Sequence, residues 1–379
     1  MSDAPRILFF ENNPAYFVSH RLALALAVRD MGYAVHVAAM PGEAAVAIRA
    51  AGFEFHPLPF QRGSMNPFRE LLTLWRIRRL YRDLQPQLVY QVTIKPVIYG
   101  TLAARNARVP RVVSVVSGLG YFALQDSLRG TLLRNLVFGF YRFALRHPCQ
   151  RVIFHNPEDR DAFVCQGILS QADTDVVPGS GVDMIYFNVS DEPAGVPVVV
   201  LAARMLRDKG VHEFVAAAAA LRAAGVQARF LLAGGTDAGN PSAIPEAQLR
   251  QWHAEGDIEW LGQVPDMRAL YATSHIVCLP SYREGMAKVL IEAAACGKPV
   301  VTTDVPGCRD AVLAGETGLL VPVRDVQELA AAIRRLIEDS TLRRRLGQQG
   351  RLLAENRFST DRVVAATLGI LRALMNGVS

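Results

Sequence analysis

Residues 275–292 have the sequence HIVCLPSYREGMAKVLIE, and this stretch decides the fold. Its apolar beginning, 275–279, predicts a strand, Gly285 predicts a turn, and 287–296 predict a helix. The first backbone N–H groups of a helix have no partner within it and lie at the positive end of its dipole, so they can bind a phosphate. The order of strand, glycine turn and helix therefore predicts a parallel α/β sheet with a ligand site beyond the carboxyl end of this strand.

Two carboxylates, Glu284 and Glu292, flank that predicted turn and helix start, eight residues apart. Eight residues of continuous helix would separate them by roughly 12 Å. That is about the length of a nucleotide-sugar diphosphate between its sugar and its ribose. Carboxylates accept hydrogen bonds from hydroxyl groups, so the pair could hold the two ends of such a ligand.

Two cations follow the first strand of the second half, residues 198–202. Arg204 stands at the carboxyl end of this strand, and Lys209 stands at the start of the next helix. A solvated charged loop would explain them if they stood alone. Together with the glutamate stretch they favour neutralisation of a diphosphate leaving group. Asp237 and Asp304 also follow strands, but neither of them stands in an Asp-x-Asp motif, so a metal-bound diphosphate is not expected.

The rest of the chain alternates short strands with helices, which predicts βαβ units and parallel sheets. In the first half the expected strands are 6–10, 34–39, 53–58, 88–92, 111–116, 151–154 and 174–177, and the expected helices are 19–31, 43–51, 69–84, 97–106, 128–147 and 159–166. In the second half the expected strands are 198–202, 228–233, 258–261, 275–279, 300–303 and 318–321, and the expected helices are 210–224, 246–255, 267–273, 287–296, 326–338 and 341–375. A loop rich in Gly, Pro and acidic residues joins two α/β halves near 180–197.

The bulk composition narrows the class of protein. A chain of 379 residues is too long for one ordinary core, so two domains are expected. Its five cysteines are odd in number and show no C-x-x-C spacing, which argues against a disulfide framework or a zinc site and suits a reducing cytosol. No signal peptide is expected at the start, and no apolar run is long enough to span a membrane.

The net excess of positive charge lies entirely in the first half. Residues 1–190 carry a net charge of +6 and residues 191–379 a net charge of zero. Within 62–151 there are 15 basic residues and 3 acidic ones, and only Lys95 of the 15 is a lysine. Such an excess implies an anionic partner, either nucleic acid or an anionic membrane surface.

Two helices of this basic region combine arginines with large apolar side chains. On the helix 128–147, Arg134 and Arg142 share one face, and apolar residues cover much of the rest. On the helix 69–84, Arg78, Arg79 and Arg82 share a side with Leu71 and Trp75. An amphipathic helix with its apolar face in the core would explain either one alone. The concentrated charge favours contact with a membrane interface.

These motifs resemble the pattern of retaining glycosyltransferase family 4, which has the GT-B fold. The resemblance is carried by Arg204, by Lys209-Gly210, and by Glu284-Gly285 followed by Glu292-Ala293, and it continues through 295–307 and 315–322. In the first half, four segments resemble a branch that adds N-acetylhexosamines to polyprenyl-diphosphate-linked glycans in bacteria, like the N-acetylgalactosaminyltransferases. They are 19–21, 93–100, 117–121 and 178–183.

The resemblance implies two Rossmann-like domains that face each other across a cleft, with the C-terminal helix returning to the first domain. An acceptor-binding domain would take in 1–185 together with about 361–379, and a nucleotide-sugar-binding domain would take in 186–360. Nearly the whole chain is covered.

It also implies roles for individual residues. Glu284 would bind donor-sugar hydroxyls, Glu292 would hold the ribose, and Arg204 and Lys209 would stabilise the departing diphosphate. The diphosphate and sugar would lie against backbone groups of the segment Gly285, Met286, Ala287, Lys288 and Val289, with Val264 near the base. On the acceptor and membrane side the candidates are His20, Lys95, Arg134 and Arg142.

The expected reaction is transfer of an N-acetylhexosamine from a UDP-sugar to a polyprenyl-diphosphate-linked saccharide, with retention and with no essential metal or other cofactor. The enzyme would be cytoplasmic, peripheral on the cytoplasmic face of the inner membrane, and held there through its basic domain. Two alternatives stay open. One is a UDP-sugar 2-epimerase on the same fold, in which the basic domain has no purpose. The other is a nucleic-acid-binding protein, which the arginine excess would suit, but the sequence shows no groove-reading motif.

Overall fold

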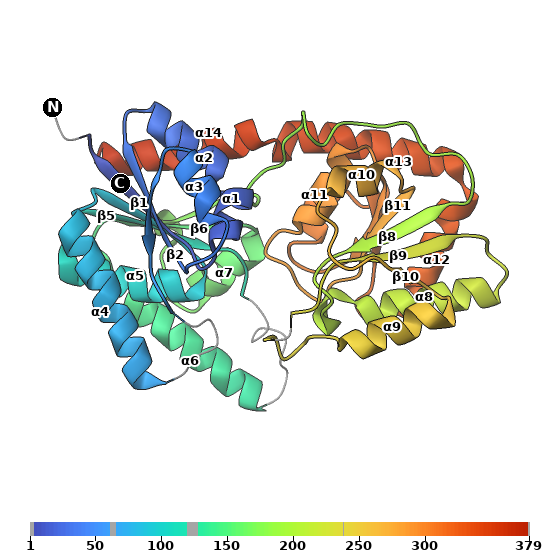
Figure 1. The fold of residues 1–379 in the computed structure, drawn as a ribbon, viewed down its shortest axis with the longest axis horizontal. Helices are drawn as coiled ribbons and strands as arrows, with labels where there is room; N and C mark the ends of the chain where they lie inside the picture. Colours follow the sequence, from blue (N-terminus) through green and yellow to red (C-terminus); the bar gives the residue numbers. More distant parts are fainter. Residues whose placement is uncertain (1–3, 61–65, 120–127, 238, 378–379) are drawn as a thin grey trace. The chain divides into compact units, whose positions relative to one another are not determined.

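The computed structural model describes residues 4–60, 66–119, 128–237 and 239–377. The chain divides into two compact units, Met1–Gly181 with Asp361–Ser379, and Val182–Thr360. Each unit is built on one parallel sheet with helices against it (Figure 1). The predicted α/β class with two Rossmann-like sheets is confirmed. In the described part of the chain, no helix has the combined length and apolar character that a membrane span requires.

The first unit holds a sheet of seven parallel strands in the order β3-β2-β1-β4-β5-β6-β7. The strands are β1 (Arg6–Phe10), β2 (Ala34–Ala39), β3 (Glu54–Pro57), β4 (Leu88–Val92), β5 (Arg111–Val116), β6 (Gln150–Phe154) and β7 (Thr174–Val176). All five residues of β4 are buried, as expected for a central strand that is covered on both faces. Since successive side chains of a strand point to opposite faces, β1 supplies Phe9 to one core and Phe10 to another.

Helices cover both faces of this sheet. The core that contains Phe9 includes residues of α1 (Pro14–His20), α2 (Leu22–Asp30), α3 (Ala45–Ala50) and α14 (Thr360–Met375). The core that contains Phe10 includes residues of α4 (Pro67–Leu84) and α5 (Ile94–Ala107), and a further cluster joins α5 to α6 (Leu128–Ala144) and α7 (Pro157–Cys165). The C-terminal helix α14 thus packs against the sheet of the first unit through Val363, Leu371 and Leu374.

The helix expected over 19–31 is wrong in its beginning. Two helices, α1 and α2, occupy this region, and Arg21 between them has a non-helical φ of −126°. The first one begins five residues early because Asn13 caps it, accepting a hydrogen bond from the Ala15 N–H at 2.9 Å, and because Pro14 occupies the first helical position. His20 consequently ends a helix and does not lie inside one.

The second unit holds a sheet of six parallel strands in the order β10-β9-β8-β11-β12-β13. The strands are β8 (Val198–Ala202), β9 (Arg229–Ala233), β10 (Glu259–Trp260), β11 (Ile276–Leu279), β12 (Val300–Thr303) and β13 (Gly318–Val321). The helices are α8 (Val211–Ala223), α9 (Glu246–Glu255), α10 (Met267–Ala272), α11 (Lys288–Ala295), α12 (Val326–Glu338) and α13 (Ser340–Leu353). The chain runs outward from β8 in one direction and then resumes at β11 in the other, so the order reverses between these two strands.

The helical stretch expected over 341–375 is not one helix. It is interrupted by a π-helical turn at Ala354–Phe358 and by Ser359, whose φ of −60° and ψ of 142° are extended. Ser359 forms a parallel bridge with Val182 instead of continuing the helix. The side chains of the interrupted turn account for the break, since Ala354 and Phe358 are buried in the core of the second unit.

Candidate functional site

The carboxyl ends of three neighbouring strands in the second unit carry the candidate residues. Arg204 and Lys209 follow β8, Asp237 follows β9, and Glu284 follows β11. The strand order reverses between β8 and β11. In sheets of this kind, the carboxyl ends of the strands at such a reversal are where ligands bind.

Lys209 and Glu284 form the central ion pair of this edge. The Lys209 Nζ lies 2.5 Å from Glu284 Oε1, and the two side chains are only 16% and 14% exposed. A charge-assisted hydrogen bond of this length, away from bulk water, holds both groups in one geometry. The sequence places these residues 75 positions apart, and only the adjacency of β8 and β11 brings them together.

Glycines allow the loops after these strands to pack directly on one another. Gly210 has a φ of +72°, and a Cβ there would lie 2.1 Å from the carbonyl oxygen of Pro280. Beside this contact the Tyr282 N–H donates to the Asp208 carbonyl at 2.9 Å. The loop that carries Lys209 is therefore locked to the loop that carries Glu284.

The loop after β12 fixes Glu284 from its other side. The Glu284 N–H donates to the Pro306 carbonyl at 3.0 Å, and the Ala287 N–H donates to the Gly307 carbonyl at 3.0 Å. Gly307 has a φ of +74°, and a Cβ there would lie 2.3 Å from the Glu284 carbonyl oxygen. The backbone of the glutamate turn is thus held between two loops, which fixes the position of its side chain.

Arg204 has a different partner. Its Nη1 lies 2.6 Å from Asp237 Oδ2, with the Arg204 side chain 40% exposed. A guanidinium has five N–H donors in a planar fork, so this one bond leaves others to turn toward a ligand. Asp237, which the sequence marks only as a residue after a strand, orients the arginine.

The segment from Gly285 to Val289 contains the turn before α11 and the first two residues of that helix. Ala287, the residue before the helix, is extended, and within the described residues no side chain caps the helix through it. Met286 and Val289 pack as partly buried side chains on the core of the unit, and Val264 packs on the same core. This arrangement offers main-chain N–H groups at the positive end of a helix, which is a known way to bind phosphate.

Glu292 lies one turn into α11 and is 8% exposed. Burial raises the pKa of its carboxyl group above the usual value, against the opposing effects of Lys288 and of a hydrogen bond from Tyr271. The Tyr271 hydroxyl donates to Oε2 at 3.2 Å, and Lys288 Nζ lies 3.8 Å from Oε1. Because α11 begins only at Lys288, the spacing of roughly 12 Å for a continuous helix from Glu284 does not apply.

The acceptor and membrane candidates of the first unit differ in burial and in hydrogen-bond partners. His20 is half-buried, with its Nδ1 at 2.6 Å from the Ser19 hydroxyl. Lys95 binds both oxygens of Glu70 at 3.0 Å, a partner that the sequence did not suggest because it lies 25 residues away on α4. Arg134 is half-buried, while Arg142 is exposed and donates to the Gln166 carbonyl.

The structure describes only part of the first-half segments that carry the family resemblance. Gly120 and Tyr121, which belong to the segment 117–121, lie outside the described residues.

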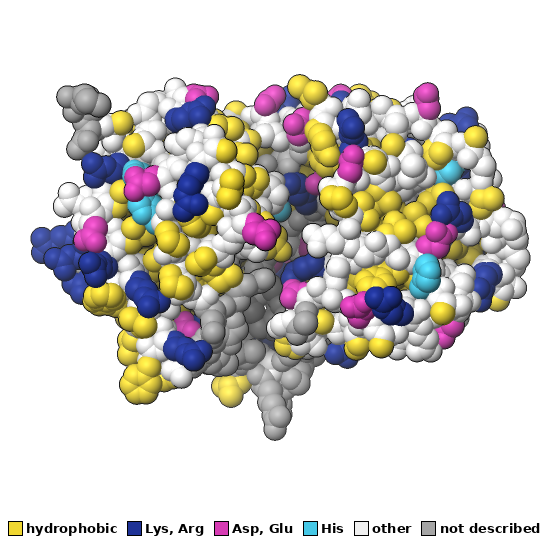
Figure 2. Space-filling view, viewed as in Figure 1, with side chains coloured by type: hydrophobic (Ala, Val, Ile, Leu, Met, Phe, Trp, Pro, Cys, Tyr) yellow, Lys and Arg dark blue, Asp and Glu magenta, His cyan; other side chains and the backbone are white. Residues whose placement is uncertain are grey.

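Helices α4 and α6, which both pack against α5, expose large apolar side chains. On α4 these are Phe68, Leu71, Leu72 and Trp75, and on α6 they are Leu132, Leu136, Phe140 and Phe143. The spacing in each set is that of a single stripe along a helix. In Figure 2 Lys and Arg side chains gather over α4 with hydrophobic side chains beside them. These side chains are therefore not buried in the core, although the sequence also allowed an amphipathic helix whose apolar face packs there.

Comparison with known proteins gives two family matches. Residues 184–353 match the family "Glycosyl transferases group 1", and residues 6–156 match "Glycosyl transferase 4-like". A similar protein is the N,N'-diacetylbacillosaminyl-diphospho-undecaprenol alpha-1,3-N-acetylgalactosaminyltransferase of Campylobacter jejuni, which is 29% identical over 90% of this chain and 92% of its own length. The capsular polysaccharide biosynthesis glycosyltransferase CapM of Staphylococcus aureus is 26% identical over 81% of each chain. Among solved structures, HepE of Anabaena in complex with UDP and glucose has a TM-score of 0.79 at 21% identity, over 97% of this chain and 99% of that one, which shows a shared fold.

Proposed function

The chain belongs to the GT-B glycosyltransferases that carry a group 1 domain, and on that basis we propose that it transfers an N-acetylhexosamine from a UDP-sugar to a polyprenyl-diphosphate-linked saccharide. The class of acceptor is supported by the similarity to the Campylobacter jejuni enzyme over most of both chains. The observation that carries the proposal is the pair Lys209–Glu284, held at 2.5 Å where the strand order reverses. It combines a cation for phosphate with a carboxylate for hydroxyl groups.

The second unit would bind the donor. Main-chain groups of the segment from Gly285 to Val289 would lie against the diphosphate, where the positive end of α11 favours negative charge, and Glu292 would accept hydrogen bonds from the ribose hydroxyls. Val264 would lie against the base. The burial of Glu292 supports this role, because a ligand hydroxyl would satisfy a carboxylate that water reaches poorly.

Bond breaking would depend on charge stabilisation. Lys209 and Arg204 would attract the negative charge that develops on the UDP oxygen as the glycosidic bond lengthens. Glu284, fixed by Lys209, would hold the sugar hydroxyls. The acceptor hydroxyl would then attack from the face that UDP leaves, with a phosphate oxygen taking its proton, so the anomeric configuration would be retained. In this scheme no side chain acts as a covalent nucleophile and no metal is required.

The first unit would meet the acceptor and the membrane. The acceptor's lipid resides in a bilayer, and α4 and α6 expose apolar side chains next to Arg78, Arg79, Arg82 and Arg142. Basic and apolar groups together favour the interface of an anionic membrane. We place the enzyme on the cytoplasmic face of the inner membrane as part of this proposal, with His20 directed to the acceptor.

A donor screen tests the proposal. Purified protein would be incubated with each of several UDP- and GDP-sugars, with and without a polyprenyl-diphosphate-linked saccharide, in the presence of EDTA. We expect UDP release that depends on the acceptor and is greatest with a UDP-N-acetylhexosamine, and an NMR spectrum of the product that shows the donor's anomeric configuration.

Three results would contradict it. An inverted linkage would remove the same-face mechanism, and loss of turnover in EDTA would remove metal independence. Formation of UDP-N-acetylmannosamine from UDP-N-acetylglucosamine without any acceptor would replace transfer by 2-epimerisation.

A further inference from the structure

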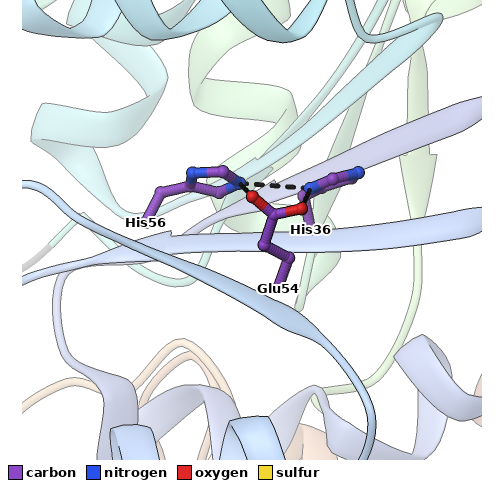
Figure 3. Close-up of side chains that lie close together, drawn as sticks. All are labelled: His36, Glu54 and His56. Atoms are coloured by element: carbon purple, nitrogen blue, oxygen red, sulfur yellow. Dashed lines mark hydrogen bonds and ion pairs between the residues drawn. The ribbon is translucent and has the colours of Figure 1, made fainter.

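A cluster of three side chains on the edge of the first sheet has no part in the proposed reaction. His36 lies on β2, and Glu54 and His56 lie on the edge strand β3 (Figure 3). The register pairs His36 with Glu54 and Ala38 with His56, and residues two apart on a strand share a face. All three side chains therefore project from the same face of neighbouring strands and converge.

The distances within the cluster are those of a coordination site. His36 Nδ1 lies 3.1 Å from His56 Nε2 and 3.3 Å from Glu54 Oε2, and His56 Nε2 lies 3.7 Å from Glu54 Oε1. A tetrahedral zinc ion with bonds of about 2.0–2.1 Å to nitrogen and oxygen keeps its ligand atoms about 3.3–3.4 Å apart. The three observed separations lie near that value, and the two that involve Glu54 end on different oxygens. The carboxylate would therefore turn to present one oxygen to the ion.

The two imidazoles are partly enclosed by the protein. His36 is buried and His56 is half-buried, and a neutral imidazole has one nitrogen lone pair that can bind a metal. The rings stack with centroids 5.3 Å apart, which fixes their orientation. The Glu54 side chain is 65% exposed and supplies negative charge on the open side.

We propose that His36, Glu54 and His56 bind one divalent transition-metal ion of the zinc type, with the fourth position open to water or to a ligand from outside. Two imidazoles and one carboxylate are a common set for zinc with an open position. Neither the cysteine spacing nor the transfer mechanism pointed to a metal. The ion would join the edge strand β3 to β2 and would stabilise the folded state by mass action. The proposal does not depend on the proposed transfer, and transfer is expected to continue without the ion.

Calorimetric titration of chelator-treated full-length protein with Zn²⁺ tests this site. Cys165 is an exposed thiol that could bind zinc by itself, so the parent protein would carry Cys165→Ser. We expect one equivalent to bind, and we expect Glu54→Gln and His56→Asn each to weaken binding by at least about tenfold. Zinc should also raise the Tm of the parent and of His212→Asn, an exposed histidine of the second unit that serves as control.

Each outcome decides the matter. Absence of a bound equivalent in the parent, or equal affinity in the parent and the Glu54→Gln and His56→Asn variants, would show that the cluster is only hydrogen-bonded. If the variants fail to fold, the visible spectrum of the parent with Co²⁺ decides instead. Intense absorption of a four-coordinate ion supports the site, and the weak absorption of a six-coordinate ion overturns it.

Discussion

The strand ends of the second unit and the helices α4 and α6 of the first unit use charge in opposite ways. At the strand ends, Lys209 and Arg204 each lie within 2.6 Å of a carboxylate that another loop supplies. On α4, Arg78 and Arg82 are exposed, next to the exposed apolar side chain of Trp75. Charges that are paired with a fixed carboxylate are suited to orient a ligand, whereas exposed charges beside apolar groups favour a membrane surface. In the proposed function, the loops of one sheet would carry the chemistry and the helices of the other would dock on the membrane.

Among the substitutions that test this comparison, Lys209→Ala should have the largest effect, and the effect should be on turnover. It removes a cation from the departing diphosphate and leaves Glu284 buried without its partner, so we expect kcat to fall by about 10²–10³. Binding to vesicles should not change. Glu259→Gln is the control, because it removes the exposed ion pair with Arg229 at the edge of the same sheet. Turnover is measured as acceptor-dependent UDP release, and near-normal turnover of Lys209→Ala would show that the pair is only structural.

The opposite result is expected for the exposed apolar stripe on α6: its replacement should weaken membrane binding and leave turnover unchanged. Replacing Leu136 and Phe140 by serine should reduce flotation with anionic vesicles by roughly 10- to 100-fold, since two large apolar side chains that are each about half buried in the interface together contribute about 1.5–3 kcal/mol. Turnover of a water-soluble acceptor analogue should be unchanged. The matched control replaces Leu313 and Leu352, which are 42% and 48% exposed in the second unit.

Varying the salt concentration separates the apolar and the electrostatic contributions to vesicle binding. The remaining attraction of the arginines to anionic lipid should weaken as ionic strength rises, because salt screens exposed charges. Equal flotation of the α6 variant and the control variant would contradict docking through this stripe.

The contact between the loops after β8 and β11 gives a sharper structural test. Gly210→Ala would place a Cβ 2.1 Å from the Pro280 carbonyl oxygen, and Gly225→Ala, at the other end of α8, meets nothing within 4 Å. Their φ angles are +72° and +77°, so backbone strain of about 1–2 kcal/mol is common to both. We expect urea unfolding to show a further loss of about 1–3 kcal/mol for Gly210→Ala alone. Equal losses would mean that the loops are free to separate.

Much of this arrangement follows from sequence, for identifiable reasons. The strands β1, β4, β8 and β12 have their predicted bounds because each is a short apolar run between turn residues. The candidate residues of the second unit were predicted because strand, glycine turn and helix have a local pattern.

Features that depend on tertiary contact were not predicted. The partner of Lys95 is Glu70 on another helix, and the π-helical turn before Ser359 follows from the burial of Phe358. The cluster of His36, Glu54 and His56 was missed because the approach of His36 to His56 depends on the pairing register of β2 and β3, which no local pattern encodes.

The smallest expected effect concerns the pH dependence of the buried Glu292. Burial raises its pKa in the folded protein, so its protonated form is favoured there, and its contribution to stability is fully present below the usual value of 4.5. That contribution is lost as the pH rises from this value through the raised pKa of the folded state. Glu292→Gln keeps a group that can accept from Tyr271 and has no charge to bury. Its free energy of unfolding relative to the parent should therefore increase with pH over that window.

Glu259→Gln provides the opposite sign. The hydrogen bond from Arg229 lowers the pKa of Glu259, so its contribution to stability is present above 4.5 and is lost as the pH falls through the lowered pKa. Urea unfolding of both variants at about pH 3, below the usual value of both groups, and at about pH 8 compares the two. The Glu292 variant should gain on the parent at the higher pH, while the Glu259 variant should show a small deficit there, because the pair is well exposed. If Glu292→Gln showed the same difference from the parent at both values, its carboxylate would not be paying for desolvation, and the argument that a ribose hydroxyl relieves that cost would fail.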